Sequence, residues 1–220
     1  MPVFQSPLCF FFFFLLLLTS SILIPSCFSL NPQGQSLLSW RKSLKGPNLQ
    51  ALDNWDSTNE TPCGWFGITC DVNKNVVELS LSYVDLLGSI PSEFTSLLTL
   101  KKLVLSGTNL TGSIPKAIGP LRDLNYLDLS DNGLTGEIPK ELFDLEKLVE
   151  LYVNTNKLEG SIPVEIGNLK NLVVFTCYDN QLGGSIPSTI GQLKNLQVIR
   201  AAETRTLKVR CRMKSVTVPA

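Results

Sequence analysis

Leu86-Leu87-Gly88-Ser89-Ile90-Pro91 is the first of five copies of the pattern Leu-x-Gly-x-Ile-Pro. The other copies begin at Leu110, Leu134, Leu158 and Leu182, so the spacing is a constant 24 residues. One register kept over five periods cannot come from composition, and self-similarity at a fixed period is the sequence signature of a solenoid. Each unit buries its apolar side only against its neighbours, which leaves an extended surface for partners. The chain is therefore predicted to be a binding protein.

Each repeat follows Leu-x-x-Leu-x-Leu-x-x-Asn-x-Leu-x-Gly-x-Ile-Pro, counted from Val76, Leu100, Leu124, Leu148 and Leu172. Positions one, four, six and eleven are apolar in every copy, so they are predicted to point into the coil. This pattern indicates the α/β class and a right-handed leucine-rich-repeat solenoid over residues 76–199, with five complete repeats and a sixth begun.

Position nine of the repeat carries an amide that can bond the backbone of the turn inside the coil. The amide is present in three copies, as Asn132, Asn156 and Asn180. Val84 and Thr108 replace it in the first two copies. This asparagine ladder is therefore expected to start at the third repeat, and the early coils are expected to depend on a cap.

Residues 30–75 are predicted to form that cap, because the first coil of a solenoid has no neighbour on its outer side. A helix is expected from Asn31, with Pro32 in its first turn and an end at Gly46-Pro47. Its buried face is expected to hold Leu37, Trp40 and Leu44. Cys63 and Cys70 flank Trp65 and are predicted to form a disulfide in an oxidising compartment.

Residues 1–29 are expected to be a secretory signal peptide, because Leu8 to Leu18 is almost entirely Phe and Leu and a small-residue exit ends at Ser29. A signal anchor left in place is the alternative, since this leader carries no Lys or Arg. No later run is apolar enough to span a bilayer, so the mature protein is expected to be soluble and extracellular. Asn59 and Asn109 begin the two acceptor sequons and are predicted glycosylation sites, with Asn109 preferred because Pro62 follows the first sequon.

The composition argues against catalysis. The chain has 19 basic and 19 acidic residues and no histidine. Without histidine there is neither a Ser-His triad nor a His-Arg-Asp kinase loop. The sequence also lacks a Walker loop and a metal-ligand cluster, so no enzyme activity, metal or cofactor is expected. Basic residues gather in residues 200–220, but a secreted chain has little use for a nucleic-acid partner.

The residues between the inward positions are predicted to face the concave side of the solenoid. Aromatic side chains stand there beside acids and amides, a composition that suits a peptide ligand or a protein partner. The alternative for any one of these residues is an ordinary solvated strand position. The candidate ligand-binding residues are Tyr126, Asp128, Asp131, Tyr152, Asn154, Tyr178, Asp179 and Arg200. Cys177 occupies an inward position and is expected to be a small buried hydrophobe.

The repeat and the cap from Asn31 to Cys70 resemble the ectodomain of plant leucine-rich-repeat receptor-like kinases over residues 30–199. Residues 34–40 and 193–201 resemble the branch that contains the root meristem growth factor receptors. The resemblance implies a peptide-hormone ligand, a coreceptor kinase of the same repeat type and a parent protein in the plasma membrane. Members of this branch carry an Arg-x-Gly-Gly element that binds the sulfate of a tyrosine-sulfated peptide. Arg200 matches it, but Ala202 and Glu203 replace the glycines, and a carboxylate there repels sulfate.

Residues 200–220 depart from the repeat and are interpreted as a frameshifted tail. Read with a one-base shift, codons from Glu203 onward can encode NKNLKGPLPDEIGNCTS, which follows the repeat pattern. On this interpretation the product is an inert or decoy fragment of the receptor. Its last complete coil is then expected to expose Leu172, Phe175, Leu182 and Ile186. Two other classes stay open: a secreted inhibitor of cell-wall hydrolases similar to polygalacturonase inhibitors, and a short coreceptor or scaffold.

Overall fold

The computed structural model describes residues 29–201. The expected signal peptide, apart from Ser29, and the tail beyond Ala201 therefore lie outside the described residues. The cap contains the helix α1 (Pro32–Ser43), the single 3₁₀ turn η1 (Leu49–Leu52) and the strand β1 (Ile68–Cys70). The repeats follow as β2 (Val76–Ser80), η2 (Ser92–Ser96), β3 (Lys102–Val104), β4 (Thr111–Gly112), η3 (Lys116–Ile118), β5 (Tyr126–Asp128), β6 (Gly133–Glu137), η4 (Lys140–Asp144), β7 (Glu150–Tyr152), β8 (Lys157–Glu159), η5 (Val164–Asn168), β9 (Val174–Thr176), η6 (Ser188–Gln192) and β10 (Val198–Arg200).

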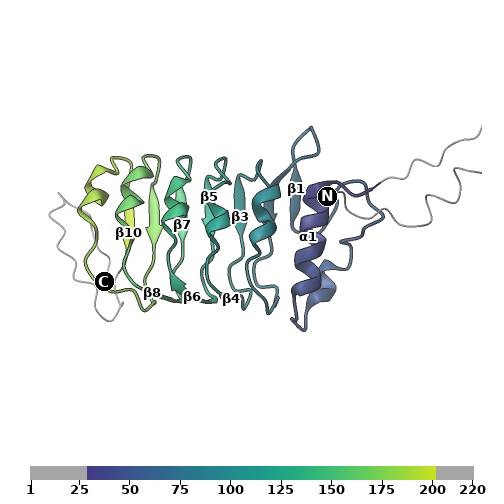
Figure 1. Ribbon diagram of the computed structural model, residues 1–220, viewed down its shortest axis with the longest axis horizontal. Coiled ribbons are helices and arrows are strands. Elements are labelled where there is room, and N and C mark those ends of the chain that lie inside the picture. Colours follow the sequence, from purple (N-terminus) through teal and green to yellow (C-terminus); the bar gives the residue numbers. More distant parts are fainter. Residues whose placement is uncertain (1–28, 202–220) are drawn as a thin grey trace, which may run out of the picture.

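Two sheets run along the solenoid, which is an elongated row of coils with α1 at one end and β10 near the other (Figure 1). The larger sheet has seven strands in the order β1-β2-β3-β5-β7-β9-β10 and is parallel except for β1. A smaller sheet, β4-β6-β8, forms where the Leu-x-Gly segments of successive repeats pair. Because each coil has the same length, Glu78 pairs with Lys102 and Lys102 with Tyr126.

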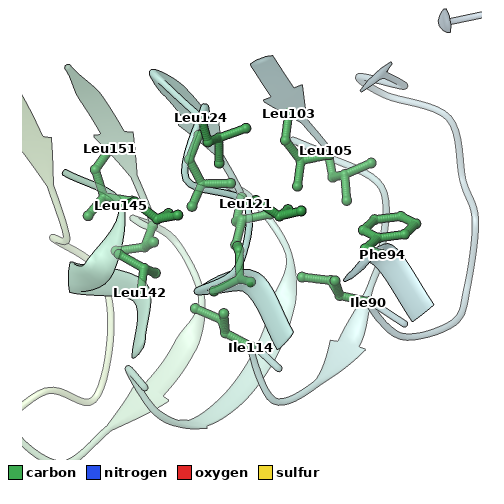
Figure 2. Close-up of a cluster of buried hydrophobic side chains, with 14 of the residues drawn as sticks. Ile90, Phe94, Leu103, Leu105, Ile114, Leu121, Leu124, Leu142, Leu145 and Leu151 are labelled. Carbon is green, nitrogen blue, oxygen red and sulfur yellow. The ribbon is translucent and has the colours of Figure 1, made fainter. Parts of the chain in front are cut away.

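The core lies between the large sheet and the 3₁₀ turns. Positions one, four, six and eleven of all five complete repeats have 0% exposure, which confirms the predicted inward set. Figure 2 shows Leu103, Leu124 and Leu151 pointing into the same interior as Ile114 and Leu142. The repeats thus share one continuous apolar core, as expected for units that cannot bury their apolar side alone.

The asparagines of position nine join each coil to the one before it. Asn132 Nδ2 donates to Leu105 O at 2.7 Å, and its Oδ1 accepts from the N–H groups of Thr108 and Leu110 at 3.1 and 3.0 Å. Asn156 Oδ1 accepts from the N–H of Leu134, and Asn180 Oδ1 accepts from the N–H of Leu158. In the second repeat Thr108 replaces the amide, and its hydroxyl donates to Leu105 O at 2.8 Å.

The cap covers the first coil with aromatic rings and hydrogen bonds. Asn31 caps α1 by accepting a hydrogen bond from the N–H of Gly34 at 2.9 Å. Trp40 contacts Phe94 edge-to-face at a centroid distance of 5.0 Å, while Trp55 and Trp65 stack at 5.4 Å. The disulfide between Cys63 and Cys70 is present, which confirms the prediction.

Backbone contacts fix the junction between the cap and the first coil. The N–H of Gly46 donates to Leu86 O at 2.9 Å, so two backbones lie against each other at this point. A Cβ on Gly46 would lie 1.8 Å from Asp85 O, which only a glycine avoids. The helix α1 ends at Ser43, before the glycine that was expected to end it, and Gly46 instead allows the first coil to lie against the cap.

One expectation about the fifth repeat is wrong. Leu172, Phe175 and Leu182 have 0% exposure. They are covered because β10 pairs in parallel with β9 and the partly buried Leu196 and Ile199 pack against the core. Of the expected set, Ile186 alone retains partial exposure, and it too packs against the core.

Candidate functional site

Two rows of side chains stand on the outward face of the seven-stranded sheet, which we call the sheet face. The first row contains the register-paired residues Glu78, Lys102, Tyr126, Glu150, Val174 and Val198. The second row contains Ser80, Val104, Asp128, Tyr152, Thr176 and Arg200. Four of the predicted ligand-binding residues therefore fall in these rows: Tyr126, Asp128, Tyr152 and Arg200.

A chain of charged and aromatic contacts crosses four strands of the sheet face, β2, β3, β5 and β7. Lys102 Nζ lies 2.9 Å from Glu78 Oε1 and 5.5 Å from the centre of the Tyr126 ring. The Tyr126 and Tyr152 rings follow with their centroids 5.6 Å apart at a tilt of 40°. The hydroxyl of Tyr152 donates a hydrogen bond to Glu150 Oε2. These contacts hold the two rings in fixed positions.

The ionisation of these groups is set by their surroundings. Burial, followed by the negative charges of Asp128 and Glu150, raises the pKa of Tyr126 above its ordinary value. Burial and then the hydrogen bond to Glu150 raise the pKa of Tyr152 further. The hydrogen bond to Glu78 raises the pKa of Lys102. At neutral pH the rings are therefore uncharged and the lysine is protonated.

Beside the second row, a band of buried polar groups forms the floor of the sheet face. Ser130 donates its N–H and hydroxyl to Asp128 Oδ1 at 3.0 and 2.6 Å. Asn154 is 7% exposed, and its Oδ1 accepts from the hydroxyl of Thr176 at 2.6 Å. Asn154 is thus a support for neighbouring groups, with little surface of its own to offer a ligand.

Position eight of the repeat, three residues beyond the end of each strand, has a left-handed backbone conformation, which the repeat pattern did not reveal. The φ angles of Tyr83, Asp131, Thr155 and Asp179 are +58°, +56°, +53° and +52°. Gly107 occupies the same position with φ +64°. Its lack of a Cβ also leaves room for the Tyr83 ring, which such an atom would meet at 2.6 Å. Asp131 and Asp179 are exposed here at the border of the sheet face.

The remaining candidates are more scattered. Arg200 is exposed at the end of β10, and Thr176 lies between it and Tyr152 in the second row. Tyr178 is half-buried and lies two residues beyond Thr176. Ala202 and Glu203, which complete the altered Arg-x-Gly-Gly element, lie outside the described residues. The structure therefore gathers the Tyr and Asp candidates of β5 and β7 and places Arg200 away from them.

Both glycosylation candidates are exposed, but their amides differ. Asn109 Nδ2, the atom that would receive a glycan, donates to Asp85 Oδ1 at 3.0 Å. In Asn59 it is Oδ1 that is engaged, accepting from the indole N–H of Trp65 at 2.7 Å. Glycosylation stays a prediction for both.

Among residues 29–201, Cys177 is the one free cysteine. Cys177 is buried, and burial raises its pKa to about 12, which suits the inert role expected of it. Over this range no group of three or more His, Cys, Asp or Glu could hold a metal ion. In the same residues no helix is long and apolar enough to cross a membrane.

Comparison with known proteins identifies the family. The leucine rich repeat N-terminal domain matches residues 30–71, and the leucine rich repeat matches residues 74–134 and 98–158. The ectodomain of BIR2 from Arabidopsis thaliana is 30% identical with a TM-score of 0.72, and the match covers 83% of this chain and 96% of that one. The chain belongs to the plant leucine-rich-repeat receptor-like kinase ectodomains.

Two further matches place this receptor-like ectodomain more closely. The receptor-like serine/threonine-protein kinase RGI3 of Arabidopsis thaliana is 48% identical over 46% of this chain and 8% of the kinase. The plant peptide hormone receptor RGFR1, solved in complex with RGF2, is 50% identical with a TM-score of 0.62, over 66% of this chain and 22% of that one. Both support the root meristem growth factor receptor-like branch.

The matches to curated relatives span only a small part of those proteins, between 8 and 11% of the first three. The domains that match are the repeat and its N-terminal domain, with no kinase domain among them.

Proposed function

We propose that this ectodomain is a non-enzymatic, extracellular binding module that holds a secreted signalling peptide on its sheet face. The observation that carries the proposal is the fixed pair of tyrosine rings beside Asp128 and Glu150, on strands that have no basic residue at their outward positions. Rigid aromatic side chains offer large contact area at low entropic cost, which suits the recognition of a short peptide. A signal peptide at residues 1–29 and an extracellular location are part of the proposal.

The solved relatives support a peptide ligand and a coreceptor. RGFR1 was solved in complex with RGF2. The receptor kinase HAESA, 32% identical over 81% of this chain, was solved with the peptide hormone IDA and the co-receptor SERK1. We extend both features to this chain: a peptide on the sheet face, and a coreceptor of the same repeat type as a second partner.

Titration calorimetry on the chain purified from a secretory host tests the proposal. Synthetic RGF2 and IDA serve as probes, and Tyr152→Ala is compared with Val164→Ala, which changes an exposed side chain in η5, away from the sheet face. We expect one of the peptides to bind and Tyr152→Ala alone to weaken binding by about tenfold or more. Absence of binding by both peptides, or equal effects of the two substitutions, contradicts the proposal.

The finer assignments concern a sulfated ligand and a decoy role. We propose that Arg200 contacts the sulfate and that Glu203 weakens this contact, so that the 220-residue product acts as a weak decoy or is inert. Replacing Ala202 and Glu203 by Gly is then expected to strengthen binding of tyrosine-sulfated RGF2 by about 1.5 to 3 kcal/mol. The same affinity in both versions argues against a role for the Arg200 element, and transcript sequence across the codons for Arg200 to Thr204 decides the frameshift.

A short coreceptor is the second candidate function. It is favoured by the near-complete coverage of the BIR2 ectodomain, 96% of which this chain matches. In this role the chain binds another repeat ectodomain rather than a free peptide. Co-purification with the RGFR1 ectodomain in the absence of peptide distinguishes the two functions.

A further inference from the structure

Tyr126 and Tyr152 of the sheet face and Tyr178, two residues beyond the end of β9, follow one diagonal in the repeat pattern. Tyr126, Tyr152 and Tyr178 are each one repeat and two residues further along the chain than the one before. Tyr126 pairs in register with Glu150, two residues before Tyr152, and Tyr152 pairs with Thr176, two residues before Tyr178. With strands about 4.8 Å apart and a rise of about 3.3 Å per residue, the Cα atoms of Tyr126 and Tyr152 are about 8 Å apart, and their rings lean toward each other to a centroid distance of 5.6 Å.

The first tyrosine of this diagonal already carries a cation. Lys102 Nζ lies 5.5 Å from the centre of the Tyr126 ring and 2.9 Å from Glu78 Oε1. An ammonium over a ring face, held by a carboxylate from the neighbouring strand, is a favourable arrangement for charge and ring together. This contact shows that the sheet face can hold a cation between a tyrosine ring and a carboxylate.

The second tyrosine has the same surroundings without the cation. Asp128 is its register partner on β5, and the Glu150 carboxylate accepts a hydrogen bond from its hydroxyl. Strands β5, β7 and β9 contain no Lys or Arg. Among residues 29–201 neither Asp128 nor Glu150 takes part in an ion pair.

Hydrogen bonds from Ser130 and Tyr152 use only part of what these carboxylates can accept. An ionised carboxylate offers about four lone-pair sites, so each keeps capacity for a further donor. Two negative charges beside an uncharged ring complement one positive charge. A guanidinium fits this site, because it is positively charged, its plane stacks on a ring and its edge donates hydrogen bonds to carboxylates.

We propose that Tyr152, Asp128 and Glu150 form a cation seat that takes one arginine or lysine side chain of the bound peptide. This inference rests on the proposed function and adds to it a charge requirement on the ligand. The seat is centred on Tyr152 of β7, the middle position of the diagonal between Tyr126 and Tyr178.

Ring-resolved NMR tests the cation seat on the full chain. The protein has only four tyrosines, so selective ring labelling gives four assignable signals. Nα-acetyl-arginine amide is the probe, and Nα-acetyl-citrulline amide is the uncharged control of the same shape. We expect arginine to shift the Tyr152 and Tyr126 signals in a saturable way, to leave Tyr83 unchanged, and to bind about tenfold more tightly than citrulline.

Asp128→Asn and Glu150→Gln keep the size of each side chain. Each is expected to weaken arginine binding, and the double variant is expected to weaken it more than either alone. The unchanged Tyr83 signal reports that the variants remain folded. Equal shifts with citrulline, equal shifts at Tyr83, no shift up to the solubility of the probe, or full binding in the double variant overturns the seat.

The same double variant separates this inference from the proposed function. If RGF2 or IDA binds in a Tyr152-dependent way but ignores the two substitutions, the peptide site stands and the cation seat is wrong. If arginine binds the seat while both peptides fail to bind, the seat stands and the proposed function is wrong.

Discussion

Replacing Asn132 by Ala is predicted to cost more stability than replacing Asn156 by Ala, although both asparagines occupy the same repeat position. Asn132 Oδ1 accepts from two backbone N–H groups, those of Thr108 and Leu110. Asn156 Oδ1 accepts from one, that of Leu134. The loss of a partner for a buried donor costs about 1 to 3 kcal/mol each. We therefore expect about 2 to 6 kcal/mol for Asn132→Ala and about 1 to 3 for Asn156→Ala.

The same substitution also removes the hydrogen bonds that Asn132 Nδ2 donates to backbone carbonyls, and this loss costs less stability. Leu105 O, which accepts from Asn132 Nδ2, also accepts from the hydroxyl of Thr108 at 2.8 Å. Ser130 O keeps the N–H of Gly107 at 3.1 Å. These acceptors retain a donor, so the cost falls on the two orphaned N–H groups.

Urea unfolding followed by far-ultraviolet circular dichroism measures the difference. Asn132→Ala should lower the free energy of unfolding by about 1 to 3 kcal/mol more than Asn156→Ala, the penalty of one additional donor. Equal losses, or a larger loss for Asn156→Ala, would refute the counting of orphaned donors. A loss near zero in both variants would show that water replaces the amides.

Three further predictions test the junction, the turns and the pH dependence. Gly46→Ala should destabilise the fold by about 2 kcal/mol or more, because its Cβ meets Asp85 O at 1.8 Å, and a shifted tryptophan fluorescence spectrum should report the loosened cap; an unchanged spectrum and midpoint would contradict this. Thr155→Gly should stabilise by about 0.5 to 1 kcal/mol, since φ is +53° there, and a lower melting temperature would speak against relieved strain. Burial raises the folded-state pKa of Tyr152 above the ordinary 10.0, so the stability that its neutral hydroxyl contributes is present below pH 10.0 and is lost as the pH rises beyond it. Tyr152→Phe should therefore lessen the alkaline slope of the free energy of unfolding by about 1.4 kcal/mol per pH unit. Parallel curves of stability against pH for the two proteins would exclude a contribution from Tyr152.

The repeat period predicted most of the architecture because burial at fixed positions is a local property of the pattern. Val76, Leu79 and Leu81 face inward for the same reason as their counterparts 24 residues later. The burial of Phe175 was not predicted, because the sixth repeat is incomplete. Its two apolar residues Leu196 and Ile199 are nevertheless enough for β10 to pair with β9 and cover the fifth repeat.

The geometry of the sheet face was less accessible. Alternation assigned Tyr126 and Tyr152 to the outward side, but the ring contact depends on which residues meet across strands. The left-handed backbone at position eight has a glycine in only one copy, Gly107, so composition gave no signal for it. Asn154 was predicted to contact a ligand, yet its low exposure follows from packing against Thr176 on the next strand.

The direction of the asparagine ladder has a consequence for how the chain is made. Each amide accepts its hydrogen bonds from the coil that precedes it, as Asn156 does from Leu134 and Asn180 does from Leu158. During synthesis a coil thus has its hydrogen bonds completed only after the asparagine one repeat later has left the ribosome. Assembly lags the growing chain by about 22 residues, the separation of each donor and its asparagine. At translation rates of about 5 to 20 residues per second, every new coil waits for about one to four seconds, a window in which a chaperone can bind its open edge.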